Sequence, residues 1–82
     1  MYCVYVLRSQ SNLRYHIGYT NDLEKRYADH NAGNNTSTKT GCPWELVYYE
    51  AFQNKSAAQT RERKLKQFGK RWAELKKRIG VG

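Results

Sequence analysis

Two short apolar runs open the chain on either side of a polar turn at residues 9–14. Residues 1–8 are apolar at nearly every position. Because successive side chains of a strand point to opposite faces, both faces of this strand are predicted to be covered. Residues 15–20 predict a second strand with two different faces. One face carries Tyr15, Ile17 and Tyr19, and the other carries His16, Gly18 and Thr20.

Helical spacing follows this hairpin. Asn21 is expected to cap a helix that runs to about Asn31, and Gly33 is placed to end it. Arg26 and His30 are four residues apart, so they project from the same side of that helix.

The rest of the chain predicts a loop, a strand and two helices. Residues 33–44 are rich in Gly, Asn, Thr and Ser and indicate a long, mobile loop, and residues 45–52 indicate a third strand. Asn54 is expected to cap a helix over about 55–67, and Trp72, Leu75 and Ile79 mark a last short helix. The order β-β-α-β-α-α predicts an α+β protein.

The length of 82 residues leaves room for one domain, which we expect to span residues 1–82. No apolar run approaches the roughly 18 residues of a membrane span, and the N-terminus lacks the pattern of a signal peptide. Cys3 and Cys42 have neither CxxC spacing nor neighbouring histidines. We therefore expect two free thiols in a cytoplasmic protein that does not enter a membrane.

The positive charge is concentrated in the last third of the chain. Residues 1–54 hold five basic and five acidic residues, whereas residues 55–82 hold ten basic and two acidic ones, so the net charge of +8 lies in that segment. Such asymmetry favours a surface that binds a polyanion, most simply nucleic acid. A solvated helical face is the alternative. An anionic membrane surface fits less well, because the segment has few bulky apolar residues to insert.

A few polar side chains have the type and position that phosphate chemistry needs. Glu62 is one of the two acids in the basic segment. It can pair with neighbouring cations or hold a divalent metal, since Mg²⁺ takes oxygen ligands and needs only one or two carboxylates. Arg26 can bind a phosphate through its guanidinium, and His30 can move a proton near neutral pH. Each can also be an exposed helix residue, and Tyr5 can be a half-buried sheet residue.

Taken in order, these segments resemble the GIY-YIG nuclease family, in particular its small stand-alone bacterial members related to the nuclease domain of the excision-repair nuclease UvrC. Two triplets ten residues apart match the signature, Cys3-Val4-Tyr5 and His16-Ile17-Gly18. The similarity continues through YTNDLEKRYADHNAG, PWELVYYEAF and RERKLK, so it covers nearly the whole chain. It implies the family's fold, a three-stranded, mainly antiparallel sheet flanked by helices.

The resemblance also implies a site. Tyr5 takes the place of the family's first-motif tyrosine, Arg26 that of its helix arginine, His30 that of the polar residue one turn later, and Glu62 that of the metal-binding glutamate. One divalent metal, Mg²⁺ or Mn²⁺, is implied as the cofactor. The basic residues expected to contact nucleic acid are Arg61, Lys64, Lys66, Lys70, Arg71, Lys76, Lys77 and Arg78.

His16 is the main departure from the family pattern, because it stands where the second triplet has tyrosine. The leading hypothesis is a metal-dependent endonuclease that cuts double-stranded DNA, in DNA repair or processing, with His16 among its catalytic residues. Two alternatives stay open. One is a module with the same fold that binds nucleic acid without cutting it, and the other is a domain that depends on a protein partner.

Overall fold

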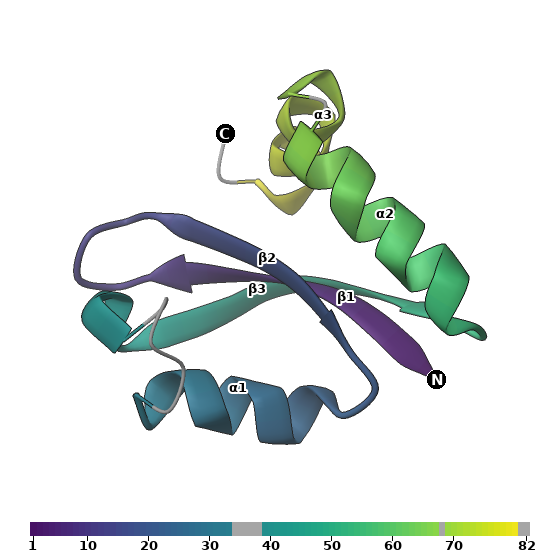
Figure 1. The fold of residues 1–82 in the computed structure, drawn as a ribbon. Coiled ribbons are helices and arrows are strands. Elements are labelled where there is room, and N and C mark those ends of the chain that lie inside the picture. Colours follow the sequence, from purple (N-terminus) through teal and green to yellow (C-terminus); the bar gives the residue numbers. More distant parts are fainter. Residues whose placement is uncertain (34–38, 68, 81–82) are drawn as a thin grey trace.

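A computed structural model describes residues 1–33, 39–67 and 69–80. The described residues form one antiparallel sheet of three strands in the order β2-β1-β3 (Figure 1). The strands are β1 (Tyr2–Ser9), β2 (Tyr15–Thr20) and β3 (Trp44–Phe52). Helix α1 (Leu23–Asn31) lies on one face of the sheet, whereas α2 (Lys55–Gln67) and α3 (Gly69–Ile79) lie on the other (Figure 1). The α+β fold and its element order are thus as predicted.

The central strand β1 is covered on both faces, which confirms the expectation from its apolar pattern. Val4 and Val6 belong to one core cluster, together with Ala58 and Leu65 of α2. Leu7, on the opposite face, packs in a second cluster with Trp44 and Leu23 of α1. Because alternate side chains of one strand feed two cores, β1 joins the layers of the molecule.

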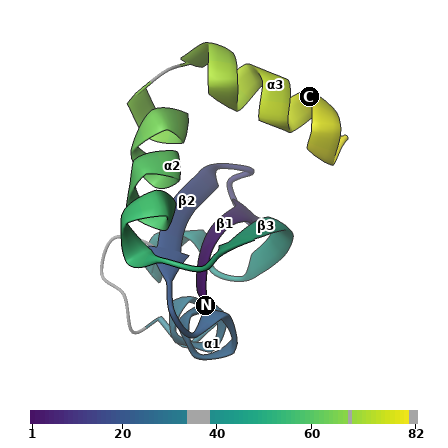
Figure 2. The same ribbon diagram turned by 90° about the vertical axis from the view of Figure 1, so that its right-hand side faces the viewer.

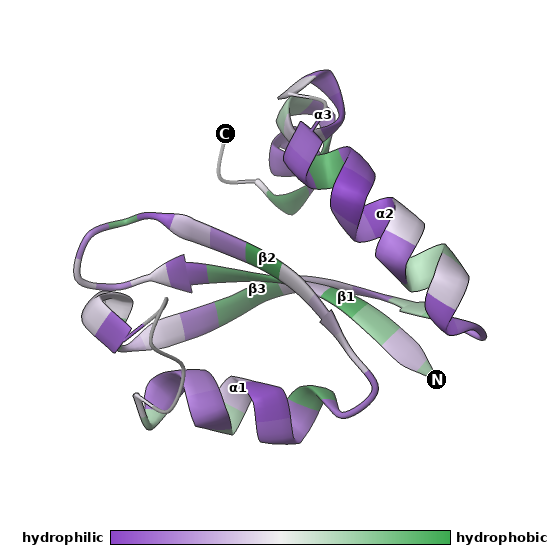
Figure 3. Ribbon diagram, viewed as in Figure 1, coloured by the Kyte–Doolittle hydropathy of each residue, from purple (hydrophilic) through white to green (hydrophobic). Residues whose placement is uncertain are grey.

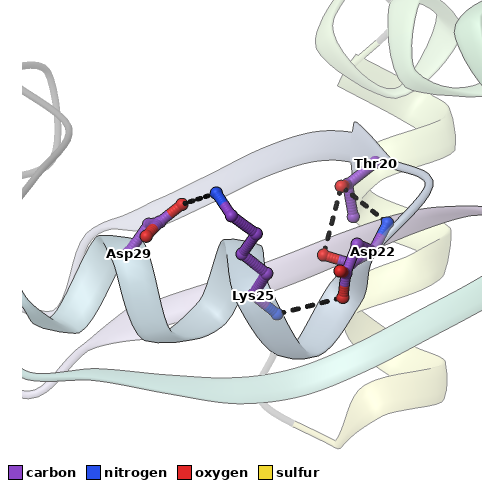
Figure 4. Close-up of polar contacts among 4 residues, drawn as sticks. All are labelled: Thr20, Asp22, Lys25 and Asp29. Carbon is purple, nitrogen blue, oxygen red and sulfur yellow. Dashed lines mark hydrogen bonds and ion pairs between the residues drawn. The ribbon is translucent and has the colours of Figure 1, made fainter.

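Helix α1 is capped by Asp22 and not by Asn21, so the expected cap was wrong by one residue. The carboxylate of Asp22 accepts a hydrogen bond from the Lys25 backbone N–H at 3.2 Å. Thr20 Oγ1 accepts one from the Asp22 N–H at 3.0 Å (Figure 4). This contact positions the Asp22 backbone at the end of β2, which favours Asp22 over Asn21 as the cap although both residue types suit that role.

The connection from α1 to β3 is partly described. Gly33 has φ of +76°, a conformation that glycine adopts without strain, and its N–H donates to the carbonyl of His30. A short 3₁₀ helix, η1 (Lys39–Gly41), precedes β3. The long loop predicted over residues 33–44 therefore contains a helical turn, and its residues 34–38 lie outside the described part of the chain.

Helix α2 begins as predicted, because Asn54 Oδ1 accepts a hydrogen bond from the Ala57 N–H at 2.8 Å. From its end, α3 turns and extends over the strands (Figure 2). Trp72 of α3 meets Tyr15 of β2 edge to face, with ring centroids 5.3 Å apart. Most of α2 and α3 is hydrophilic, whereas hydrophobic residues run through the strands (Figure 3). No helix in the described ranges is long and apolar enough to cross a membrane.

Candidate active site

A cleft of about 460 Å³ lies beside β2, and its walls include residues from β1, α1 and α2. The residues that line it include Tyr5, His16, Gly18, Arg26, Glu62 and Lys66. Four of the five residues that the sequence indicated as catalytic therefore share one cleft. The fifth, His30, lies directly behind Tyr5.

Tyr5 connects the cleft to the protein interior. Its side chain is 2 % exposed, and its hydroxyl lies 3.1 Å from Nε2 of His30. Burial raises the pKa of Tyr5 to about 12, an effect that the Arg26 charge partly offsets and the Glu62 charge increases. The hydroxyl therefore keeps its proton at neutral pH and can donate it to the His30 ring.

His30 is fully buried, which excludes the alternative of an exposed helix residue. Burial and the nearby Arg26 charge lower the pKa of His30, so the neutral ring predominates at pH 7. A neutral imidazole has one nitrogen that accepts a hydrogen bond, and Nε2 can accept from Tyr5. The thiol of Cys42 donates to the His30 carbonyl at 2.9 Å, and neither Cys3 nor Cys42 is in a disulfide.

His16 extends this aromatic group toward the cleft. Its ring centroid lies 4.8 Å from that of His30 and 6.1 Å from that of Tyr5. Burial lowers the pKa of His16 to about 4, and the charges of His30, Lys66 and Arg26 act in the same direction. His16 is thus a neutral ring at pH 7, because its pKa lies well below neutrality.

Gly18 makes room for the Tyr5 hydroxyl. A Cβ atom at this position would lie 2.5 Å from Tyr5 Oη and 2.7 Å from Cζ, closer than non-bonded atoms approach. Gly18 pairs directly with Tyr5 across the β1–β2 ladder. Any larger residue would push the tyrosine out of the cleft wall, so the last residue of the second triplet has a steric role.

Charged groups of both signs surround this wall. Arg26 is exposed on α1, and its charge reaches Tyr5, His16 and His30. Glu62 lies on α2 with its side chain 20 % exposed, and its carboxylate is 3.7 Å from the ammonium of Lys66. Glu62 therefore pairs with a cation, as one of the two roles weighed from the sequence requires, and it also lines the cleft.

The resemblance implies a divalent metal, and the donor set of the cleft fits one. No group of three or more His, Cys, Asp or Glu side chains that could hold a metal occurs among the described residues. Glu62 is the one carboxylate among the described residues that line the cleft. A single carboxylate suits Mg²⁺ or Mn²⁺, which keep several waters and take their other oxygen ligands from a phosphate.

Lys55 also lines the cleft and was missed by the sequence reasoning. It is the first residue of α2, where the helix dipole disfavours a cation. A basic residue at a helix N-terminus departs from the local rule, and such departures tend to mark functional positions. That departure is the signal by which Lys55 could have been found.

The basic residues predicted to contact nucleic acid differ in their local surroundings. Lys66 faces the cleft, whereas Lys70 and Lys77 are exposed on α3 and Lys76 lies 5.8 Å over the Trp72 ring. Arg61 donates two hydrogen bonds to the carboxylate of Glu50. Arg61, Arg71 and Arg78 line a second, smaller cavity.

The chain is similar to known proteins over most of its length. The chain is 44% identical over 68 residues to a UPF0213 protein of Staphylococcus haemolyticus. This match covers 82% of each of the two chains. It is 39% identical over 71 residues to a UPF0213 protein of Halobacterium salinarum, covering 85% of this chain and 91% of the other.

Its fold is similar to the solution NMR structure of a UPF0213 protein from Bacillus halodurans. The TM-score is 0.59 and the sequence identity 28%, and the match covers 100% of this chain and 88% of that one. The family model described as the GIY-YIG catalytic domain matches residues 1–78. The chain therefore belongs to the GIY-YIG family, whose members are nucleases.

Proposed function

We propose that this protein is a divalent-metal-dependent endonuclease that hydrolyses phosphodiester bonds of double-stranded DNA, in DNA repair or processing. Membership of the GIY-YIG family supports a nuclease that binds nucleic acid. The observation that carries the proposal is the convergence of Tyr5 from β1, Arg26 from α1 and Glu62 from α2 on one cleft. These residues are far apart in the sequence, and phosphodiester hydrolysis needs their three kinds of side chain together.

Glu62 would hold the Mg²⁺ or Mn²⁺ ion, which when bound supplies positive charge at the scissile phosphate. Arg26 adds a guanidinium from α1, and such a group stabilises the negative charge that develops on phosphate oxygens in the transition state. Lys55 and Lys66 line the same cleft and attract the polyanionic strand.

Tyr5 and His30 provide a path for a proton. When the Tyr5 hydroxyl donates to Nε2 of His30, at the observed 3.1 Å, the lone pairs of the tyrosine oxygen remain free to accept a hydrogen bond from the attacking water. As the water loses its proton to that oxygen, the tyrosine proton can pass to the neutral imidazole. The lowered pKa of His30 keeps the ring neutral and able to accept.

The test compares wild type with Glu62→Gln in a supercoiled-plasmid nicking assay with Mg²⁺, with Mn²⁺ and with a chelator. The substitution keeps the size of the side chain and removes the charge that balances the cation. We expect nicking to fall by about a hundredfold or more, because the loss of one preorganised electrostatic group typically costs that much. The melting temperature should change little, because the ion pair of Glu62 with Lys66 is long, at 3.7 Å, and an i,i+4 helix pair contributes about 0.3–0.5 kcal/mol.

The matched control is Glu24→Gln, which removes an exposed acid from the first turn of α1. It should nick as wild type does. Equal nicking by wild type and Glu62→Gln would show that the metal assignment is wrong. If wild type binds duplex DNA but does not nick it in the presence of any divalent metal, the protein is the non-cleaving binding module that the His16 departure allows.

A further inference from the structure

We propose that a second cavity, between α2 and α3, binds a backbone phosphodiester of the nucleic acid whose scissile bond occupies the active-site cleft; this inference rests on the proposed function. The cavity has a volume of about 120 Å³ and is lined by Arg61, Arg71, Glu74, Leu75 and Arg78. It shares no lining residue with the active-site cleft. Three guanidinium groups from two helices thus converge on a space suited to one small anion.

Arg61 is fixed in place before any ligand arrives. Its Nε and Nη2 donate to the two carboxylate oxygens of Glu50 at 2.8 and 3.0 Å, and the Tyr48 hydroxyl donates to the same carboxylate at 2.7 Å. A guanidinium has five N–H donors, so this pair uses two of them and leaves the rest for another acceptor. Because Glu50 already restricts the Arg61 side chain, that side chain would lose little further rotamer entropy when a ligand binds.

Arg71 and Arg78 line the cavity from α3. Arg61 and Glu50 together connect α2 to β3, which is a structural role. In contrast, neither Arg71 nor Arg78 forms an ion pair with an acidic side chain among the described residues. Their spacing of seven, with Glu74 and Leu75 between them, puts all four on one face of α3, toward the cavity. Within the described ranges, neither guanidinium is therefore held in an ion pair, although Arg78 hydrogen-bonds the Tyr48 hydroxyl and its charge also acts on Glu50.

The local charge selects the kind of anion. Three arginines and the acids Glu50 and Glu74 leave this region with a net charge of about +1. A phosphodiester carries one negative charge, whereas a phosphate monoester carries nearly two at pH 7. The Glu74 carboxylate in the cavity wall disfavours the second charge, and guanidinium groups bind the oxygens of a diester in pairs. The site therefore fits a backbone phosphate of a nucleic acid better than a terminal or free phosphate.

The first experiment uses dimethyl phosphate as the probe and follows the side-chain Nε–H signals of the arginines by NMR. Saturable shifts are expected for Arg71 and Arg78, with Arg14, which is exposed on the hairpin, unchanged. Inorganic phosphate should bind more weakly than dimethyl phosphate. Shifts that do not saturate, or that are equal at Arg14, would overturn the site.

The second experiment measures duplex binding in a chelator, so that cleavage plays no part. Arg71→Gln with Arg78→Gln is compared with Lys70→Gln and Lys77→Gln, which remove the same charge from exposed positions of the same helix. The arginine pair should lose about tenfold more affinity than the lysine pair, because it loses charge-assisted hydrogen bonds as well as long-range attraction. Equal losses would overturn the proposal even if dimethyl phosphate binds.

Two further readings keep the test decisive. Arg71→Lys with Arg78→Lys keeps both charges and removes the guanidinium groups, so its duplex affinity should fall several-fold. This variant replaces the glutamine variant in the comparison if the glutamine variant fails to fold. Duplex binding that depends on the arginine pair without any nicking by wild type would support the cavity and contradict the nuclease proposal. If wild type nicks DNA and the arginine and lysine double variants lose equal affinity for the duplex, the nuclease proposal is supported and the cavity proposal is contradicted.

Discussion

His16 shows how much the surroundings of one residue decide its chemistry. In solution an imidazole titrates near pH 6.5. In the packed group with His30 and Tyr5, burial lowers the pKa of His16 to about 4. The residue that departs from the family signature is thus a neutral ring near pH 7, and its ring packs against those of His30 and Tyr5.

This shift makes stability depend on pH in a defined window. Because the folded pKa lies below the ordinary value, the unfolded chain takes up the proton first as the pH falls. The stability contributed by keeping His16 neutral and buried is therefore fully present above about pH 6.5, and it is lost as the pH falls toward 4. His16→Tyr and His16→Gln should each lose less stability than wild type between pH 7 and pH 5, measured as the free energy of unfolding in urea.

Comparison of the two variants separates titration from ring size, since neither new side chain titrates in this window. Any limb of the cleavage profile near neutrality should also survive His16→Tyr, because His16 does not titrate there. A stability loss in both variants as large as that of wild type would mean that the imidazole is solvated and unshifted.

At the scale of elements, the pair of Arg61 and Glu50 connects α2 to β3, on the side of the helix away from the cleft. Both side chains are largely buried, with 26% and 18% exposed. Burial alone would raise the pKa of Glu50, but hydrogen bonds from Arg61 and Tyr48 outweigh it and lower the pKa. This contact and the core packing of Ala58 and Leu65 both attach α2, which carries Glu62, to the sheet.

Glu50→Gln should destabilise the protein by about 1–3 kcal/mol at pH 7, because it leaves a partly buried guanidinium without its charged acceptor. Because the pKa of Glu50 is lowered in the folded protein, the stability that its carboxylate contributes is present above about pH 4.5. This stability is lost as the pH falls through the pKa of Glu50 in the folded protein. Wild type and variant should therefore converge in strongly acidic solution when melting is followed by circular dichroism.

Glu45→Gln is the matched control, since Glu45 is an exposed acid on the same strand whose carboxylate accepts a hydrogen bond from the Gln10 side chain. It should cost less than about 1 kcal/mol at any pH. A Glu50 variant that melts as the Glu45 variant does would exclude a role for this pair in holding α2.

At the scale of the molecule, charge is divided between the two faces of the sheet. The hairpin, α1 and β3 are together neutral, whereas α2, α3 and the residues after them carry the whole net charge of +8. Since α2 and α3 lie on the same face of the sheet, nucleic acid should approach from that side (Figure 1).

Duplex affinity should accordingly fall steeply with salt, with a log–log slope of about −0.9 for each phosphate contact. Lys70→Gln with Lys77→Gln should make that slope shallower. Arg14→Gln with Lys39→Gln removes the same charge from exposed positions in the neutral part of the chain and should leave the slope unchanged. A change of slope in the second pair alone would move the binding surface to the other face of the sheet.

The elements of this protein could be predicted from the sequence, because strands and helices follow from local side-chain spacing and caps. The two apolar faces of β1 and the start of α2 at Asn54 were confirmed for that reason. The cap of α1 was missed by one residue, since Asn21 and Asp22 both suit the role and only a contact from Thr20 distinguishes them. The resemblance supplied Tyr5, Arg26, His30 and Glu62 as a set, but not their arrangement.

What the tertiary structure decided is how these groups meet. The contact of Tyr5 with His30 joins positions 25 residues apart, and the pair of Arg61 with Glu50 joins positions 11 apart in different elements. Burial depends on everything that packs around a group, and burial is the largest cause of the shifted pKa values of Tyr5 and His16. The sequence alone therefore determined which side chains are present and on which elements, whereas packing determined which are buried, which are neutral and which face the same cleft.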